Sequence, residues 1–191
     1  MEPKRYPRQL SRGDSNAAIA LSETEAGKLF GDDTRSDIGS EAEKMRFANE
    51  VNGLVVKFLR LETNEALGTD MLVMERIYPI DFRAYEVEMR EIWFDVFTDE
   101  LRALHQAGFV HRALLRPSNL PGDRYDNILL TTQGLRLIDV GISVLQRQVG
   151  ESFFWAYVQR ELEELALFRE FFRAVKLPQW HKKQRWLVTL A

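Results

Sequence analysis

Apolar residues in the second half of the chain recur every three or four positions, a spacing that predicts long amphipathic helices. One such pattern fills residues 84–107 and stops at Gly108, a residue type that commonly ends helices. The same spacing returns in residues 152–175 and predicts a second helix. A third, shorter helix is predicted to begin at Ser40, because a serine cap is followed there by glutamates and then by apolar residues at near-helical spacing.

Short apolar runs flanked by turn residues predict strands, most of them in the first half. Residues 54–62 and 70–77 are β-rich and separated by the turn-prone sequence TNEALGT, so we expect an antiparallel pair. Residues 10–30 suit a β-hairpin, and the runs NILLT (127–131) and LRLID (135–139) suit two strands joined by the turn TQG. A β-rich first half followed by a helical second half predicts an α+β fold.

Composition narrows the class of protein. The 191 residues suffice for one folded unit, and 45% hydrophobic with 29% charged residues are typical of a globular protein with a core. The formal net charge of −3 provides no overall positive field, so we expect neither nucleic acid nor membrane as a partner. The lack of cysteine excludes disulfides and thiolate metal sites, and no apolar run approaches the ~20 residues that a membrane helix needs. We therefore expect a cytoplasmic protein.

Two stretches of the chain carry the pattern of a known family. The sequence DELRALHQAGFVHRALL contains His111, Arg112 and Ala113, and NILLTTQGLRLIDVGIS contains Asp139 at the start of DVG. The first stretch resembles the helix and catalytic loop of the eukaryotic-like protein kinase superfamily. The second resembles the strand pair that leads to the magnesium-binding DFG motif of that superfamily. The resemblance covers residues 10 to about 145.

This resemblance implies a two-lobed fold that binds ATP and Mg²⁺. A small β-rich N-lobe would comprise residues 10–78, and a reduced helical C-lobe would comprise residues 79–191. Residues 1–9, which are basic and contain two prolines, would form a loosely packed N-terminal arm. The sequence LVMERI resembles the hinge between the lobes, where the backbone of Glu75 and Ile77 would hydrogen-bond adenine.

The family pattern also implies metal ligands. Asp139 would be the carboxylate that bridges Mg²⁺ to the phosphates, and an asparagine from the catalytic loop would supply a second, neutral oxygen. Asn127 opens the strand NILL, as the asparagine of the family does, and we favour it although it requires an insertion of roughly nine residues in the loop. Asn119 is the rival, because RPSN imitates the lysine-proline-x-asparagine step of the family.

The match is thinner in the N-lobe. The sequence EAGKLF resembles the third kinase strand, with Lys28 as the lysine that contacts the α- and β-phosphates. Glu43 is predicted to pair with Lys28, and Glu41, one register away, is the alternative. The sequence LSRGDSNAA is a degraded form of the glycine-rich loop, in which Gly13 and Ser15 would lie against the phosphates.

The family places an aspartate where this chain has Ala113. That aspartate orients the acceptor hydroxyl and accepts its proton, so we expect the chain to be catalytically inactive or nearly so. The alanine fits an engineered inactivation of a Ser/Thr protein kinase, which we favour, or a natural pseudokinase that acts as a binding or regulatory module. A small-molecule phosphotransferase is a weaker alternative, because that class usually has glycine where this chain has Arg112.

The chain is shorter than most kinases and lacks the APE motif after Gly141. In scale it is similar to small bacterial effector or toxin kinases, which implies a protein substrate or a regulatory protein partner, and action in the cytosol of a target cell if it is an effector. Three glutamates in the last helix (Glu161, Glu163 and Glu164) are expected to be solvated, and His105 is expected to be a packing or surface residue. The basic, aromatic end of the chain is interpreted as a plain terminal segment, although it could dock a partner.

Overall fold

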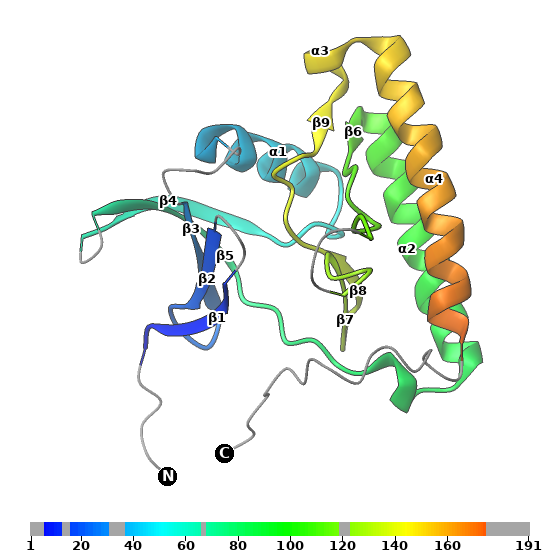
Figure 1. Ribbon diagram of the computed structural model, residues 1–191, viewed down its shortest axis with the longest axis horizontal. Helices are drawn as coiled ribbons and strands as arrows, with labels where there is room; N and C mark the ends of the chain where they lie inside the picture. The colour runs from blue at the N-terminus through cyan, green and yellow to red at the C-terminus, as the bar shows by residue number, and fades with distance from the viewer. Residues whose placement is uncertain (1–5, 13–15, 31–36, 66–67, 119–122, 175–191) are drawn as a thin grey trace.

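The computed structural model describes residues 6–12, 16–30, 37–65, 68–118 and 123–174. Its first part is a five-stranded antiparallel sheet in the order β1-β2-β3-β5-β4, with the helix α1 beside it (Figure 1). The strands are β1 (Arg8–Arg12), β2 (Asn16–Ala20), β3 (Glu25–Phe30), β4 (Phe58–Asn64) and β5 (Thr69–Glu75), and α1 is Ile38–Val51.

The sheet region differs from the sequence prediction at its edge. Residues 10–30 form three strands rather than a hairpin, and β1 begins at Arg8, inside the predicted arm of residues 1–9. Tyr6 also belongs to the folded part, since its hydroxyl donates to Glu23 Oε1 at 2.7 Å. The predicted antiparallel pairing of the next two strands is confirmed, because Leu61 in β4 lies opposite Leu72 in β5.

The second part is built on two long helices that lie side by side (Figure 1). The helix α2 (Val87–Ala107) ends at Gly108, whose φ of 97° is a conformation that favours glycine, and α4 is Glu151–Arg173. Both helices confirm the predicted ones with small differences at their ends. The smaller elements are η1 (Phe82–Ala84), β6 (Phe109–Val110), β7 (Ile128–Thr131), β8 (Gly134–Leu137), β9 (Val144–Leu145) and α3 (Gln146–Val149).

Two short antiparallel ladders arrange the loops between these helices. Strand β7 pairs with β8, as the sequence predicts, and β6 pairs with β9. Together, the five-stranded sheet and the helices make this a mixed α+β fold. None of the helices within the described ranges is long and apolar enough to cross a membrane.

The connection after α1 joins the two parts. Leu54, Val55 and Val56 are buried, and instead of extending β4 they follow β8: Val56 N–H donates to Leu137 O, and Leu137 N–H donates to Leu54 O. This is why the strand predicted to start at Leu54 starts at Phe58. The main hydrophobic core runs across this junction, from Phe30 and Met45 in the first part to α2 and α4 in the second.

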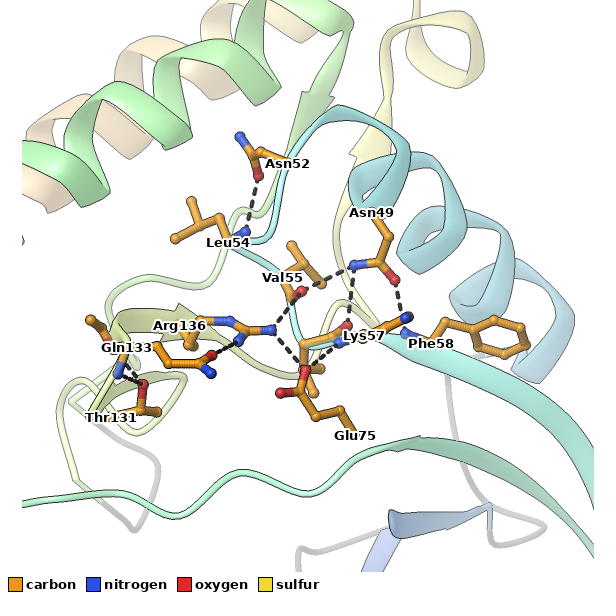
Figure 2. A network of polar contacts seen from close by, with 12 residues as sticks. Asn49, Asn52, Leu54, Val55, Lys57, Phe58, Glu75, Thr131, Gln133 and Arg136 are labelled. Carbon is orange, nitrogen blue, oxygen red and sulfur yellow. Dashed lines mark hydrogen bonds and ion pairs between the residues drawn. The ribbon is translucent and has the colours of Figure 1, made fainter. Parts of the chain in front are cut away.

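A network of polar contacts connects the elements at the same junction (Figure 2). Arg136 in β8 donates to the Glu75 carboxylate in β5 at 2.9 Å. Asn49 in α1 donates to Val55 O at 3.0 Å and accepts from Phe58 N–H at 2.8 Å. Three elements are thereby tied to the connecting segment, which sets the position of the sheet relative to the helices.

Candidate functional site

Lys28 lies at the centre of a cluster of charges drawn from three elements. Its ammonium donates to both carboxylate oxygens of Glu41 in α1, at 2.8 and 3.0 Å, and to Asp139 Oδ1 in the loop after β8, at 2.7 Å. Lys28 and Glu41 are buried, at 8% and 2% exposure, whereas the Asp139 side chain is 53% exposed. Asp139 is therefore the open side of the cluster.

The electrostatics of the cluster follow from this burial. Desolvation opposes the charge on Lys28, but the carboxylates of Asp139 and Glu41 outweigh it and raise the pKa of Lys28 above its usual value. Desolvation likewise opposes the charge on Asp139, but Lys28 outweighs it and lowers the pKa of Asp139. Burial raises the pKa of Glu41, and Lys28 offsets that rise only in part. Lys28 thus stays protonated, and the ionised carboxylate of Asp139 is the part of the cluster that solvent reaches.

The predicted Lys28–Glu43 pair is wrong, and the alternative Glu41 is the partner of Lys28. Helix α1 starts at Ile38 with Asp37 as its cap, not at Ser40; Asp37 Oδ1 accepts from Ser40 N–H at 2.6 Å. Residues two apart in a helix project about 200° apart, so Glu43 leaves the face that Glu41 occupies. Glu43 instead pairs with Arg147 at 2.5 Å, with both side chains about half exposed.

A second contact holds α1 against the loop after β8. Lys44 lies one helical turn beyond Glu41 and donates from Nζ to Gly141 O at 3.0 Å. Asp139 has a φ of 59°, in the left-handed region, and its Oδ1 accepts from Gly141 N–H at 3.4 Å. Helix α1 is therefore linked to the Asp139 loop directly through Lys44 and indirectly through Lys28, which bonds both Glu41 and Asp139.

The loop that carries Ala113 is fixed by hydrogen bonds to its backbone. Glu161 in α4 is 1% exposed and accepts from Arg112 N–H at 2.5 Å and from the His105 ring at 3.1 Å. His111 is fully buried and its ring bonds Ile138 O at 3.0 Å, directly before Asp139. The positions of residues 111–113 thus depend on groups outside the loop and not on the side chain at position 113.

Arg112 itself is turned away from Ala113. It has a φ of 69°, its guanidinium lies 4.1 Å from the centroid of the Tyr157 ring, and its Nη1 donates to Ile142 O at 3.1 Å. A cation on the face of an aromatic ring is an electrostatically favourable arrangement. Arg112 therefore links the Ala113 loop to the segment after Asp139.

Asn127 is hydrogen-bonded to Ala113 and to Ile138, the residue before Asp139. Its Nδ2 donates to Ala113 O at 3.0 Å, and its own carbonyl accepts from Ile138 N–H at 3.0 Å. The first bond uses the nitrogen end of the amide, so Oδ1 is the end available to a cation. The rival Asn119 lies outside the described residues, as do Gly13 and Ser15.

The donor set suits magnesium bound together with phosphate. No group of three or more His, Asp or Glu close enough to hold a metal is found in the described part of the chain. Magnesium typically uses only one or two carboxylates and completes its shell with water and phosphate oxygens. Asp139 and Asn127 fit that requirement, with Asp139 as the charged ligand.

In the predicted hinge, the backbone N–H of Glu75 already has a hydrogen-bond acceptor. Glu75 N–H donates to Lys57 O at 2.9 Å, and the Glu75 carboxylate accepts from Arg136 (Figure 2). An adenine at this edge would therefore have to use other backbone groups, such as the Glu75 carbonyl and Ile77 N–H. The adenine contacts of both residues stay a prediction.

Three polar residues have roles that the sequence did not indicate: Glu161, Glu164 and His105. Glu161 and Glu164 were expected to be solvated with Glu163, yet Glu161 is 1% and Glu164 7% exposed, and only Glu163 is on the surface. The helical spacing contained the signal, since Glu161 falls on the same stripe as the buried Phe154, Val158 and Leu165. His105 is buried as a hydrogen-bonding partner of Glu161 and not merely as a packing residue.

Taken together, the site contains a cation held between two carboxylates, one of them exposed, and a hydrogen-bonded loop without a proton acceptor at position 113. Binding of phosphate by Lys28 and of Mg²⁺ by Asp139 stays a prediction. No protein-family model matches the chain, and a comparison with curated proteins found no relative.

Proposed function

We propose that this chain is a two-lobed, protein-kinase-like domain that binds ATP together with Mg²⁺ and transfers phosphate slowly or not at all. The observation that carries the proposal is the Lys28 cluster. A buried lysine on a strand pairs with a helix glutamate and with an aspartate that follows a short strand pair, from positions far apart in the sequence. The kinase resemblance of the sequence requires that convergence.

The parts of the site have distinct roles in this proposal. Lys28 would neutralise the α- and β-phosphates, and Glu41 would hold it in place. Asp139 and Asn127 would hold the magnesium ion, which supplies charge neutralisation at the phosphates when bound. The sheet region would be the N-lobe and the α2–α4 region the C-lobe, with the nucleotide between them.

In this proposal, the slow or absent phosphoryl transfer follows from Ala113. A methyl group neither accepts a proton nor orients an acceptor hydroxyl, so the step that the aspartate assists loses its general base. The loop around Ala113 still has the hydrogen bonds that fix it. This supports an engineered inactivation of a Ser/Thr protein kinase, because replacing the aspartate alone would leave those bonds in place. A natural pseudokinase that binds a regulatory protein is the second candidate, favoured by the same alanine; in both cases we place the chain in a cytosol.

The test is calorimetric titration of the full chain with ATP, with and without Mg²⁺. We expect millimolar or tighter affinity that increases with Mg²⁺. Asp139→Asn should remove most of the magnesium dependence, and Lys28→Met should weaken binding in both conditions by about tenfold or more, which is ~1.4 kcal/mol. Glu43→Gln is the matched control, because Glu43 pairs with Arg147 on the surface, and it should bind as the unchanged chain does.

Two results would contradict the proposal. The first is no ATP binding at saturating magnesium by a chain whose folding is verified by circular dichroism. The second is binding that neither Asp139→Asn nor Lys28→Met alters, since the nucleotide would then occupy a different site.

A further inference from the structure

An apolar stripe on α2 faces away from the core. Met89, Ile92 and Val96 are 43%, 57% and 54% exposed. Their spacing of three and four residues puts them on one face of the helix. Single exposed apolar residues are ordinary in proteins, whereas a continuous row of large ones is a surface that commonly binds another segment.

Carboxylates border this stripe. Glu88, Asp95 and Asp99 are exposed, and no ion pair of Glu88 or Asp95 is found among the described residues. Asp99 has only a 3.5 Å contact with Arg102, and both of those side chains are mostly exposed. The apolar stripe therefore has a row of carboxylates along one edge, a pattern that a basic amphipathic segment complements.

A groove runs beside the stripe, between α2 and α4. Its volume is about 570 Å³, and it is lined by residues that include Asp95, Thr98, Asp99 and Leu165. Thr98 is 8% exposed, and within the described ranges its hydroxyl has no hydrogen-bond partner. A buried hydroxyl without a partner costs free energy, so the lining of this groove includes an unsatisfied polar group.

The end of α4 is hydrogen-bonded to the first turn of α2. Arg90 in the first turn of α2 is 3% exposed, and its Nη1 donates to Phe172 O at 2.8 Å and to Ala174 O at 3.1 Å. The chain beyond Ala174 therefore departs from the Arg90 end of α2, in the same helical turn as Met89.

The sequence after that point has the complementary composition. Residues 176–191 read KLPQWHKKQRWLVTLA, with four basic side chains, no acidic ones and two tryptophans. From Ala174 to Trp186 the chain can reach about 40 Å if extended and about 18 Å if helical, whereas the stripe from Met89 to Asp99 is about 15 Å long. The segment can cover the stripe in either conformation.

We propose that residues 176–190 dock on α2 of the same chain, with their tryptophans on Met89, Ile92 and Val96 and their basic residues on Asp95 and Asp99. The inference does not depend on the proposed nucleotide site. It accounts for both the exposed apolar row and the exposed carboxylates beside it.

The lack of native cysteine makes the test direct, because one introduced cysteine accepts one nitroxide label. The full ¹⁵N chain with Gln184→Cys, carrying a nitroxide on that cysteine, is measured by NMR before and after chemical reduction of the nitroxide. With the nitroxide intact, the amide signals of residues 88–99 should have less than half of the intensity that they have after reduction. Amides of β7 and β8 should keep their intensity. Unchanged α2 signals would overturn the proposal.

Two comparisons make the result specific. Asp95→Lys with Asp99→Lys should restore the α2 intensities, and adding Lys182→Glu with Lys183→Glu should diminish them again. Glu50→Lys with Glu65→Lys makes the same change in net charge on exposed residues of the sheet region and should change nothing. The last control mixes ¹⁵N chain that carries no nitroxide with nitroxide-bearing ¹⁴N chain, and we expect no loss of signal in this mixture. A loss of α2 signals would show that the segment docks on a second copy, which overturns docking within one chain.

Discussion

The Lys28 cluster and the Ala113 loop are both held by hydrogen bonds, but only the Lys28 cluster is built from charged side chains. At Lys28 the side chains themselves form the structure, since the lysine, Glu41 and Asp139 bond one another directly. At Ala113 the structure comes from backbone bonds to Glu161 and Asn127, and the side chain of residue 113 takes no part. Loss of a charged group would therefore break bonds of the Lys28 cluster, whereas the residue type at position 113 does not enter the hydrogen bonds that hold its loop.

The largest effect on stability is expected where the Ala113 loop depends on a buried charge. Glu161→Ala would leave both Arg112 N–H and the His105 ring without their acceptor, so the free energy of unfolding should fall by about 2–4 kcal/mol. Urea denaturation measures the change. Glu163→Ala, the same change at an exposed position of the same helix, should remain within about 0.5 kcal/mol of the unchanged chain. Equal effects of the two substitutions would show that Glu161 does not support the loop.

A smaller effect is expected at the Lys28 cluster, because Lys28 has two carboxylates. Glu41→Gln should lower the free energy of unfolding by about 1–2 kcal/mol, since Asp139 still pairs with the buried lysine. Glu43→Gln breaks an exposed pair and should cost about 0.5 kcal/mol or less. The same urea series compares them. A larger loss for Glu43→Gln would reverse the assignment of the Lys28 partner.

The smallest effect concerns pH. Because Lys28 lowers the pKa of Asp139, ionisation of Asp139 stabilises the fold above the usual aspartate value of 3.8, and this contribution is lost as the pH falls through the lower folded value. Since Asp139 is half exposed, solvent reduces the size of the effect. Titration of the Asp139 carboxyl carbon by NMR should give a pKa below 3.8, and Lys28→Met should raise it. An unshifted pKa in the unchanged chain would mean that the 2.7 Å ion pair is absent in solution.

The sequence predicted those parts of the molecule that depend on local patterns. The helical period located α2 and α4, and the turn TQG between apolar runs located β7 and β8. The segment 54–56 could not be placed in this way, because its partner Leu137 lies far along the chain and only the folded structure pairs them. Strand β1 was missed for a different reason, since its partner β2 is the next strand in sequence but β1 begins inside the basic segment that was assigned to the N-terminal arm.

The candidate site was predictable in its residue types and less so in its register. Lys28, Asn127 and Asp139 were singled out from the kinase resemblance, and the structure brings Lys28 and Asp139 together. The prediction of Glu43 rested on aligning LVVKF (54–58) with the fourth strand of the kinase pattern, whereas β4 starts only at Phe58 and Glu41 is the residue that bonds Lys28. Glu161 was overlooked because glutamate is rarely buried unless it is paired, and its partners on the Ala113 loop are distant in sequence.

Restoring the missing acid tests the central claim most directly. We expect Ala113→Asp to produce phosphoryl transfer from radiolabelled ATP to the chain itself or to proteins of a lysate, since general-base catalysis contributes about 10²- to 10⁴-fold. Ala113→Asn is the matched control, because its amide does not accept the proton, and Ala113→Asp combined with Asp139→Ala should again be inactive. An Ala113→Asp chain that binds ATP and Mg²⁺ but transfers no phosphate to itself or to any lysate protein would contradict the account of a complete kinase site that lacks only its base.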